Sequence, residues 1–469
     1  MRAAFALIAL AACGPAAPQL DRPLEKRPTL TDVNPDPKIV EVNLVAAEGT
    51  QVLLAGKPAA AIWGYRDGSQ AAALPSTPGP TIEANVGDQL IIHFKNELPF
   101  PTTVHWHGLR LPPASDGSTV TQNPINTGDS YDYVYTLRDP GTFWYHPHVK
   151  GDEQVEHGLY GALIVHGGPE IPASADRVFI IDDVKLAASG QLSAELDALD
   201  VMLGRQGNVL LVNGQSDKQL EVAAGTRERW RFINSSNGRW FNLRVKGHRF
   251  TVFGWDGGAI PTPYVVDTLL VAPGERYEVA IDFDDEPGAE LLLETIYYDR
   301  GHDIPDQGPL KMLTLEVGAK GKASAALPQM PSLEPVATDG STMTRSFKLE
   351  EHEDPTGGID TTFTINGEMW PFNQPVMVDL GATEIWSIDN TANNMDHPFH
   401  LHGMFFQVLD VNGQPPEHTG WKDTVNVPQL STLRFAVKYE TAGMWMFHCH
   451  ILEHAERGMM GDLMVMAPP

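Results

Sequence analysis

The pattern of apolar and polar positions repeats three times along the chain. Residues 87–96 (GDQLIIHFKN), 225–234 (GTRERWRFIN) and 381–390 (GATEIWSIDN) each begin with glycine, alternate apolar and polar side chains, and end with asparagine. Alternation bounded by glycine and asparagine predicts a half-buried β-strand. The chain therefore contains an internal repeat, which indicates a fold built from several copies of one structural unit.

A second repeated segment closes the first and third of these units. Residues 141–148 (GTFWYHPH) align with residues 443–450 (GMWMFHCH). In the middle unit, Leu293 and Thr295 follow Gly288 at the offsets where the other two units have histidines. We therefore expect three homologous β-units, with the middle one serving as a spacer.

The length and composition agree with this organisation. At roughly 100–200 residues per domain, 469 residues allow three domains, and short β-branched and aromatic runs separated by 43 Gly and 37 Pro favour all-β sandwiches. We expect a leading segment at 1–36, units at 37–168, 172–318 and 344–469, and a linker at 319–343. The linker is poor in large apolar residues and rich in Ala, Pro, Ser and Gly.

The charge narrows the choice of partners. The formal net charge is -27 and the isoelectric point is about 4.9. This balance disfavours nucleic acid and anionic lipid, and it favours cationic or neutral substrates and metal ions.

The N-terminus is typical of an export signal. Residues 1–13 (MRAAFALIALAAC) contain one basic residue, an apolar run too short to span a bilayer, and small residues before Cys13. Residues 10–13 resemble the bacterial lipobox, in which the cysteine is lipidated; the alternative is ordinary cleavage nearby. We expect an exported protein of the periplasm or cell envelope, with Cys13 as its lipid anchor and its single membrane contact.

Ten of the 17 histidines lie in four short clusters. These are residues 105–107 (HWH), 146–148 (HPH), 397–402 (HPFHLH) and 448–454 (HCHILEH). Each cluster has two histidines two positions apart, a spacing that places both imidazoles on one face of a strand. One such pair is weak evidence, because a hydrogen-bonded core histidine is common, but four pairs indicate a metal-binding protein.

The last cluster adds a thiol and a thioether. Cys449 lies between His448 and His450, so in a strand its side chain points to the opposite face from theirs. A thiolate with imidazoles and a more distant methionine, here Met459, is the ligand set of a blue-copper site. With Cys13 acylated, Cys449 would be the one thiol of the chain, which fits a thiolate reserved for metal.

These four clusters resemble the copper-ligand motifs of the multicopper oxidases, in order and in spacing, over nearly the whole chain. The resemblance implies three tandem cupredoxin-like Greek-key β-sandwich domains and four copper ions: one type 1, one type 2 and a type 3 pair. It assigns type 1 copper to His397, Cys449, His454 and Met459, and type 2 copper to His105 and His400. The type 3 pair takes His107, His146, His148, His402, His448 and His450. Because the middle unit lacks ligands, the trinuclear cluster is expected where the first and third units meet.

The resemblance also implies an enzyme. It would take single electrons from a reductant at type 1 copper, pass them through Cys449 to His448 and His450, and reduce O₂ to water at the trinuclear cluster. We expect a monomer that oxidises phenols and aromatic amines like a laccase, because no Met-rich or His-rich insertion is visible. The alternatives are a metallo-oxidase of Cu(I), Fe(II) or Mn(II) for metal tolerance, and a copper-free interaction protein, against which the complete ligand set argues.

Oxygen reduction also requires an acid near the cluster. Asp116 is one candidate, although Ser115-Asp116-Gly117 also fits a simple turn. Many bacterial relatives have a glutamate directly after the last type 1 histidine; here Ala455 stands there, and the neighbouring Glu456 is the candidate replacement. Asp396 is expected to orient a substrate or a ligand. Residues 350–354 (EEHED) are interpreted as a solvated acidic turn rather than a metal-gathering loop.

Overall fold

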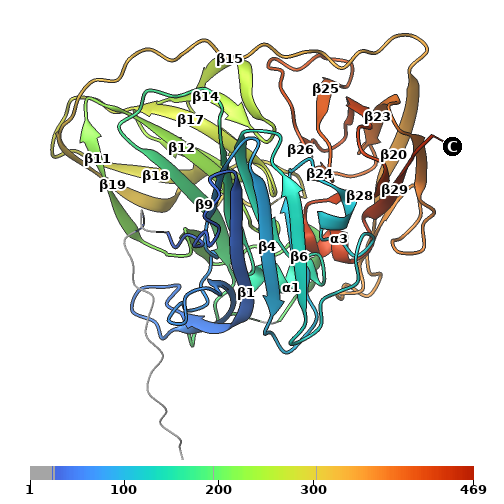
Figure 1. The fold of residues 1–469 in the computed structure, drawn as a ribbon, viewed down its shortest axis with the longest axis horizontal. Coiled ribbons are helices and arrows are strands. Elements are labelled where there is room, and N and C mark those ends of the chain that lie inside the picture. Colours follow the sequence, from blue (N-terminus) through green and yellow to red (C-terminus); the bar gives the residue numbers. More distant parts are fainter. Residues whose placement is uncertain (1–23, 25–26, 194, 303, 469) are drawn as a thin grey trace, which may run out of the picture.

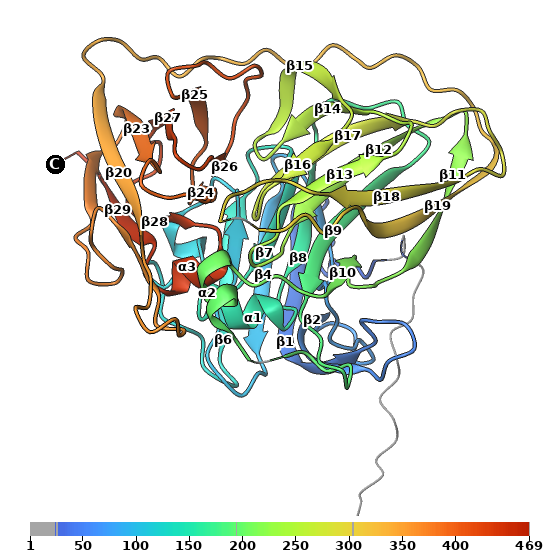
Figure 2. The same ribbon diagram turned by 180° about the vertical axis from the view of Figure 1, so that it is seen from behind.

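The computed structural model describes residues 24, 27–193, 195–302 and 304–468. The predicted export signal and Cys13 lie outside these residues. Six β-sheets make up almost all of the regular structure, and they form two sheets in each of the three units. The predicted all-β fold of tandem sandwiches is therefore confirmed, and Figures 1 and 2 show the first unit in blue and cyan beside the green-yellow middle unit and the orange-red third unit.

The first unit has two four-stranded sheets, in the orders β2-β1-β4-β6 and β3-β8-β7-β5. Their strands are β1 (Ile39–Gln51), β2 (Ala60–Asp67), β3 (Ile82–Asn85), β4 (Gln89–Asn96), β5 (His105–His107), β6 (Ser130–Thr136), β7 (Gly141–His146) and β8 (Gly161–His166). Strand β5 lies at a sheet edge and pairs antiparallel with β7, so that His105 is opposite His146. The two histidine clusters of this unit therefore share one sheet edge.

The middle unit has a six-stranded sheet, β10-β9-β12-β17-β14-β15, and a five-stranded sheet, β11-β19-β18-β13-β16. Its strands are β9 (Asp176–Val184), β10 (Val209–Val212), β11 (Lys218–Ala224), β12 (Arg227–Asn234), β13 (Phe241–Val245), β14 (Phe250–Trp255), β15 (Gly258–Val266), β16 (Leu269–Val271), β17 (Arg276–Asp282), β18 (Glu290–Ile296) and β19 (Leu310–Lys320).

The third unit has two five-stranded sheets, β21-β20-β23-β27-β25 and β22-β29-β28-β24-β26. Its strands are β20 (Met343–His352), β21 (Thr362–Ile365), β22 (Val376–Asp379), β23 (Thr383–Asp389), β24 (His397–Leu401), β25 (Phe406–Val411), β26 (Thr424–Val427), β27 (Thr432–Lys438), β28 (Gly443–Cys449) and β29 (Met460–Met466). Strands β24 and β28 pair antiparallel, with His400 opposite His448.

The three repeated segments form equivalent strands, β4, β12 and β23; buried and more exposed positions alternate along β4 and β23 and along the first half of β12. The glycine before each strand has a positive φ of 89°, 67° and 84° at Gly87, Gly225 and Gly381, a conformation that side-chain-bearing residues rarely adopt. The asparagines that end the segments are fully buried, and each side-chain amide donates to a backbone carbonyl four or five residues later in the chain. Each repeat is thus a strand that follows a glycine turn and ends in a buried, hydrogen-bonded asparagine.

Helices are short and few among the described residues. They are α1 (Gly151–Glu156), α2 (Ala198–Leu203), α3 (Leu452–Glu456) and the 3-10 turn at Pro113–Ser115, and α1, α2 and α3 lie together in Figure 2. No described helix is long and apolar enough to cross a membrane.

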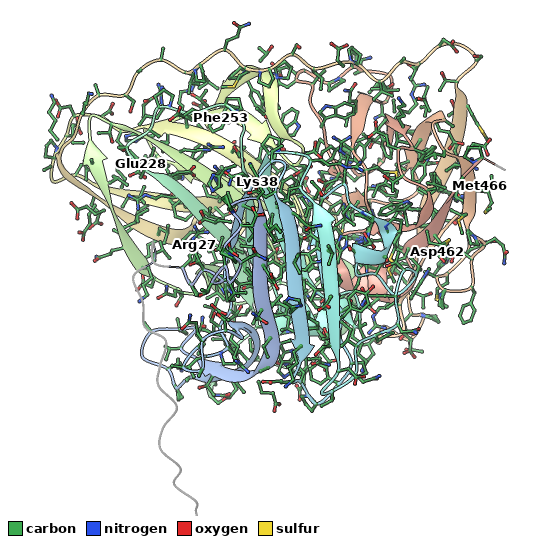
Figure 3. All side chains as sticks on the ribbon, viewed as in Figure 1. Arg27, Lys38, Glu228, Phe253, Asp462 and Met466 are labelled. Atoms are coloured by element: carbon green, nitrogen blue, oxygen red, sulfur yellow. The ribbon has the colours of Figure 1, made fainter. Side chains whose placement is uncertain are left out.

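The expected linker is extended. Between the end of β19 and the start of β20 it contains no helix or strand, and Figure 1 shows it crossing the top of the molecule from the middle to the third unit. Its Met330 is buried against Phe253 of β14, which Figure 3 labels beneath the crossing segment. This contact ties the linker to the middle unit.

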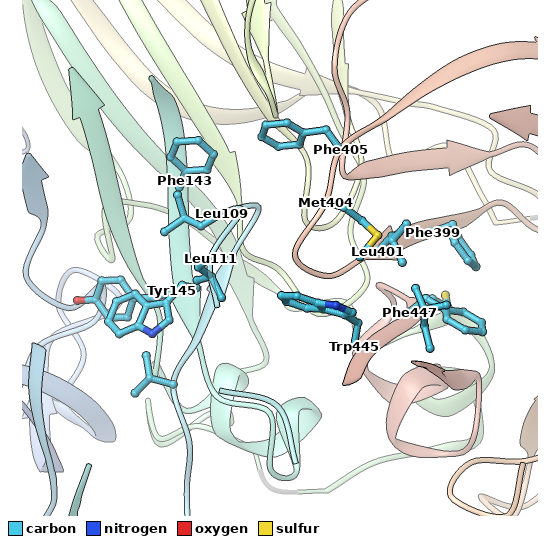
Figure 4. Close-up of a cluster of buried hydrophobic side chains, with 14 of the residues drawn as sticks. Leu109, Leu111, Phe143, Tyr145, Phe399, Leu401, Met404, Phe405, Trp445 and Phe447 are labelled. Carbon is cyan, nitrogen blue, oxygen red and sulfur yellow. The ribbon is translucent and has the colours of Figure 1, made fainter. Parts of the chain in front are cut away.

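One cluster of buried apolar side chains contains residues of both the first and the third unit. Figure 4 shows Leu109, Leu111 and Phe143 of the first unit opposite Met404 and Trp445 of the third. The middle unit has its own core cluster around Trp230. Burial of shared apolar surface therefore holds the first and third units together along the edge where their histidines lie.

Candidate metal centre

Eight histidines from four strand ends meet between the first and third units. Strands β5 and β7 with the residues after them supply one half, and β24 and β28 with the residues after them supply the other. All eight are buried, and they are His105, His107, His146, His148, His400, His402, His448 and His450. This group is called the imidazole cluster below.

The rings of the imidazole cluster make contact across the two units. His105 stacks on His402 with ring centroids 3.9 Å apart, and His107 stacks on His400 at 3.8 Å. Groups whose ligand atoms all lie within 4.8 Å of one another include His105, His400 and His402, and also His148, His402 and His448. The centroids of His448 and His450 are 5.5 Å apart, so both residues flanking Cys449 join the cluster.

Most rings in the cluster are oriented through one nitrogen. The Nδ1 atoms of His105, His146, His400 and His448 donate to backbone carbonyl oxygens at 2.8 to 3.0 Å. A carbonyl only accepts, so these contacts fix the proton on Nδ1 and leave a lone pair on Nε2. Hydrogen bonds to the far nitrogen are what orient histidine ligands in metal sites.

Seven ring nitrogens of the cluster are buried without a hydrogen-bond partner among the described residues. They are His105 Nε2, His107 Nδ1, His146 Nε2, His148 Nε2, His400 Nε2 and both nitrogens of His450. Nε2 of His402 lies 3.1 Å from Nε2 of His448. Buried polar atoms nearly always have a partner, so this concentration of orphaned acceptors fits bound metal ions with nitrogen ligands.

Several imidazoles of the cluster are held in the neutral form. Burial, followed by the neighbouring imidazoles, lowers the pKa of His402 to about 3 and the pKa of His146, His148 and His448 well below the ordinary value. Neutral imidazole is the form that binds a metal, so the cluster is electrostatically prepared for cations.

Asp116 lies against the imidazole cluster. It is 1% exposed at the end of the 3-10 turn, and its carboxylate oxygens lie 3.1 and 3.2 Å from Nδ1 of His402 and 3.5 Å from Nδ1 of His105. Burial raises the pKa of Asp116, but His402 and His105 outweigh it and hold this pKa well below its ordinary range. Asp116 therefore occupies a turn and also contacts two rings of the cluster.

Asp423 and Arg276 also belong to this site, and no local sequence pattern indicated them. Asp423 Oδ1 accepts from Nε2 of His107 at 3.1 Å, and its backbone oxygen accepts from His400. Arg276, from the middle unit, donates from Nη1 and Nη2 to the two carboxylate oxygens of Asp423 at 2.7 and 2.6 Å. Nε of Arg276 donates to the carbonyl of Thr142 in the first unit. Arg276 thus joins all three units, and the middle unit contributes this contact although it lacks the histidine pairs.

The second predicted ligand set lies in the core of the third unit. His397, Cys449, His454 and Met459 are all 0% exposed, and the rings of His397 and His454 are 5.3 Å apart. Burial raises the pKa of the Cys449 thiol, whose sulfur accepts from the Ile451 amide at 3.4 Å, and Nδ1 of His454 is orphaned. Among the described residues, these side chains do not form a group with all ligand atoms within 4.8 Å.

The nitrogens of His397 face protein oxygens instead. Nδ1 donates to Asn390 Oδ1 at 3.1 Å, and Nε2 lies 3.3 Å from Glu351 Oε1. The other oxygen of Glu351 lies 3.1 Å from Nε2 of His302. Glu351 is 8% exposed and lies in β20, so the interpretation of residues 350–354 as a solvated turn is wrong at this position.

The remaining candidate acids lie apart from the imidazole cluster. Asp396 accepts from the Tyr298 hydroxyl, the Asn426 amide and the Gln429 backbone amide. Glu456, at the end of α3, accepts from the backbone amide of Gly151 at 2.6 Å. Burial and then Asp152 raise the pKa of Glu456 to about 7.

Comparisons with known proteins give one family. Three models described as multicopper oxidase match residues 64–170, 183–293 and 344–468. A multicopper oxidase of Staphylococcus epidermidis is 30% identical over 82% of this chain and 82% of its own, and a laccase of Bacillus subtilis is 28% identical over 94% and 97%. The structure of a multicopper oxidase from Campylobacter jejuni, described as a metallo-oxidase, superposes with a TM-score of 0.82 at 30% identity, covering 97% of this chain and 96% of that one.

The first prediction concerns the ion pair that joins the units. Arg276→Ala leaves Asp423 as an unpaired buried charge, so we expect it to lower the free energy of unfolding by about 3–5 kcal/mol. Arg244→Ala, which breaks the half-exposed pair with Glu294 in the same unit, should cost about 1 kcal/mol or less. Denaturant unfolding of both metal-free variants measures the difference. Equal losses would show that Arg276 does not hold the units together.

Proposed function

The chain belongs to the multicopper oxidases, enzymes in which bound copper couples oxidation of a reducing substrate to consumption of O₂, and on that premise we propose that it holds four copper ions. The observation that carries this proposal is the set of buried, neutral, unpartnered imidazole nitrogens in the cluster. The three tandem domains are cupredoxin-like, and we place their boundaries at 37–168, 172–318 and 344–469.

We assign the ligands by position in the clusters. His105 and His400, whose Nε2 atoms are both orphaned, would hold the type 2 ion. His397, Cys449, His454 and Met459 would hold the type 1 ion in the core of the third unit. The type 3 pair would be held by the other six members of the imidazole cluster, which are His107, His146, His148, His402, His448 and His450.

When bound, the copper ions accept single electrons from a reductant and supply four of them to O₂. The chain itself connects the two ligand sets and excludes water from them. Cys449 lies directly between His448 and His450, so three consecutive residues link the two ligand sets. All three are at most 1% exposed, which keeps bulk water away from both sets.

We propose that Asp116 is the residue that handles protons at the cluster. Its carboxylate accepts from the Nδ1 atom of His402 and faces that of His105. It therefore orients two ligand rings, and its oxygens can receive a proton and pass it on. Glu456, the other candidate, hydrogen-bonds Gly151 at the helix junction, so its role would be in proton entry from that side.

We propose phenols and aromatic amines as the reductants, with a laccase among the relatives as support. A metal ion such as Cu(I), Fe(II) or Mn(II) is the second candidate, because Glu351 places a carboxylate between His397 and His302. Carboxylate and imidazole together suit a transition-metal cation.

We also propose that the protein works outside the cytoplasm as a monomer. The basis for export is the sequence of residues 1–13, and we propose Cys13 as the lipidation site. Metabolic labelling with a fatty acid, compared between the natural chain and Cys13→Ala, tests the anchor.

Cys449→Ser tests the type 1 assignment. A serine hydroxyl is a hard, neutral and poor copper ligand, whereas the imidazole cluster stays complete. We expect loss of the blue absorption and of substrate oxidation, and a decrease from four to three copper ions per chain by elemental analysis. His248→Ala in the middle unit is the control and should keep all four. A blue Cys449→Ser protein, or one without any copper, would contradict the assignment.

Asp116→Asn tests the proton role. Asparagine keeps the size of the side chain but cannot relay a proton, and a placed acid or base contributes roughly 10²–10⁴-fold. We expect reoxidation by O₂ to slow at least tenfold while reduction by substrate changes little, as followed by stopped-flow absorbance of the blue site. Asp129→Asn, an exposed change of equal charge, is the control. Unchanged reoxidation at unchanged copper content would leave Asp116 as a turn residue.

Steady-state rates on 2,6-dimethoxyphenol and on Cu(I) separate the two substrate classes. We expect the phenol to have the higher kcat/KM. Glu351→Gln removes the carboxylate charge beside His397 while keeping its shape, so under the metal-ion alternative it should reduce kcat/KM for Cu(I) at least tenfold and leave the phenol nearly unaffected. A higher kcat/KM for Cu(I) in the unaltered protein would favour the metallo-oxidase.

A further inference from the structure

A small pocket lies beside residues 295–302 and 304–310 of the middle unit, near the point where Arg300 and Gly301 contact the third unit. Its volume is about 60 Å³, and its walls include Gln206, Arg239, Trp240, Tyr298 and Arg300. A cavity needs roughly 10–15 Å³ of such volume to hold one water molecule, so the pocket has room for a few waters or one small polar group. Its rim includes the exposed Pro305 and Gln307, so a ligand can enter from solvent.

Arg300 is the unusual wall of this pocket. It is 2% exposed, and its Nε and Nη2 atoms have no hydrogen-bond partner among the described residues. Its guanidinium lies over the Trp240 ring at 4.6 Å, and Nη1 has a weak contact with the Met395 sulfur at 3.6 Å. Burial and then Arg239 lower the pKa of Arg300 to about 9, so the group is still charged at neutral pH. A buried charge without a partner is costly.

The two unpartnered atoms of Arg300, Nε and Nη2, are the atoms with which other arginines of this chain bind carboxylates. Arg177, Arg231 and Arg345 each use Nε and Nη2 to grip the two oxygens of one carboxylate, at 2.7 to 2.9 Å. This planar fork matches a carboxylate in geometry as well as in charge. Arg300 lines the pocket, and its own fork is covered by protein and has no hydrogen-bond partner among the described residues.

Among the described residues, the two carboxylates that act on Arg300 already accept other hydrogen bonds. Asp183 accepts from Nε of Arg239 at 2.6 Å and from the Gly207 amide. Asp396 accepts from Tyr298, Asn426 and Gln429. Two guanidinium groups therefore line the pocket, and Arg300 has no hydrogen-bonded carboxylate in the described part of the chain.

The pocket is joined to the proposed type 1 ligands through the backbone. The Asp396 amide donates to the carbonyl of Arg300 at 2.8 Å, and Gly301 pairs with Met395 as an isolated bridge. Asp396 directly precedes His397. A molecule held by Arg300 is therefore held one residue along the chain from a ligand to which a reductant must deliver electrons.

We propose that the Arg300 fork binds the carboxylate of a phenolic acid, which makes aromatic acids a favoured reductant class. The substrate part of this proposal rests on the proposed oxidation of phenols. The pocket accommodates the carboxylate, and the aromatic ring would lie at the rim, against apolar surface such as Ile304 and Pro305. The chain as a whole has a formal net charge of -27, so it repels anions overall. A preference for an anionic substrate would therefore have to come from the positive charge of Arg300 at the pocket.

Calorimetric titration of the copper-loaded protein with benzoate tests the site directly. Benzoate has the ring and the carboxylate but no phenolic hydroxyl to oxidise. We expect saturable binding to the natural protein and at least tenfold weaker binding to Arg300→Gln, since a charge-assisted hydrogen bond contributes more than a tenfold change in affinity. Arg249→Gln changes the net charge equally at an exposed pair with Asp267 and should bind like the natural protein. Absence of binding, or equal binding by Arg300→Gln, would overturn the site.

Two further arms complete the test. Acetate distinguishes a free small anion from an aromatic acid: binding at least tenfold weaker than that of benzoate is expected, and equal affinity would overturn the phenolic acid as ligand. Arg300→Lys keeps the charge but lacks the fork, so it should also weaken benzoate binding, and it serves if Arg300→Gln does not fold.

The kinetic arm compares 4-hydroxy-3,5-dimethoxybenzoate with 2,6-dimethoxyphenol, which differ by the carboxylate alone. The ratio of their kcat/KM values should fall at least tenfold in Arg300→Gln and stay unchanged in Arg249→Gln. An unchanged ratio in Arg300→Gln would overturn the specificity role. If neither phenol is oxidised, the proposed function fails, while the benzoate titration still decides whether the pocket binds a carboxylate.

Discussion

The structure depends on the burial of eight imidazoles at one contact between two domains. Each ring has been removed from water, and in His105, His146 and His400 one nitrogen donates to a backbone carbonyl while the other has no partner among the described residues. Unpaired buried acceptors are destabilising, so the metal-free chain must hold them in place with other interactions. The apolar core shared by the first and third units supplies that force, and bound metal ions would remove the penalty.

The middle domain has lost the histidine pairs, yet its contacts help to shape the cluster. Arg276 reaches Asp423 of the third unit and Thr142 of the first. Gly274 has a φ of 83°, and a Cβ there would lie 2.8 Å from ring atoms of His450, so its backbone packs directly on a cluster ring. A domain without ligands thus fixes both the charge beside His107 and the position of His450.

The sequence predicted those parts of the molecule that repeat or follow local spacing. Strands β4, β12 and β23 followed from apolar alternation, and the meeting of the histidine pairs followed from their absence in the middle unit. Asp423 and Arg276 could not be found in this way, because they are 147 residues apart in the chain and are brought together only by domain packing. Glu351 was misjudged because the acidic run 350–354 looks solvated, whereas strand pairing turns one of its carboxylates inward.

At the proposed type 1 site, Arg300 is a buried charge and Cys449 is a buried thiol whose ionised form would also be a buried charge. Burial raises the pKa of the Cys449 thiol, and the carboxylate of Glu351 raises it further, while Arg300 acts in the opposite direction. A thiolate in this core therefore needs positive charge nearby, and a metal ion supplies most of it. An arginine satisfied by an internal carboxylate would lose much of its influence on the thiolate. A fork without an internal carboxylate preserves that influence, and the proposed carboxylate ligand would be the partner that it lacks.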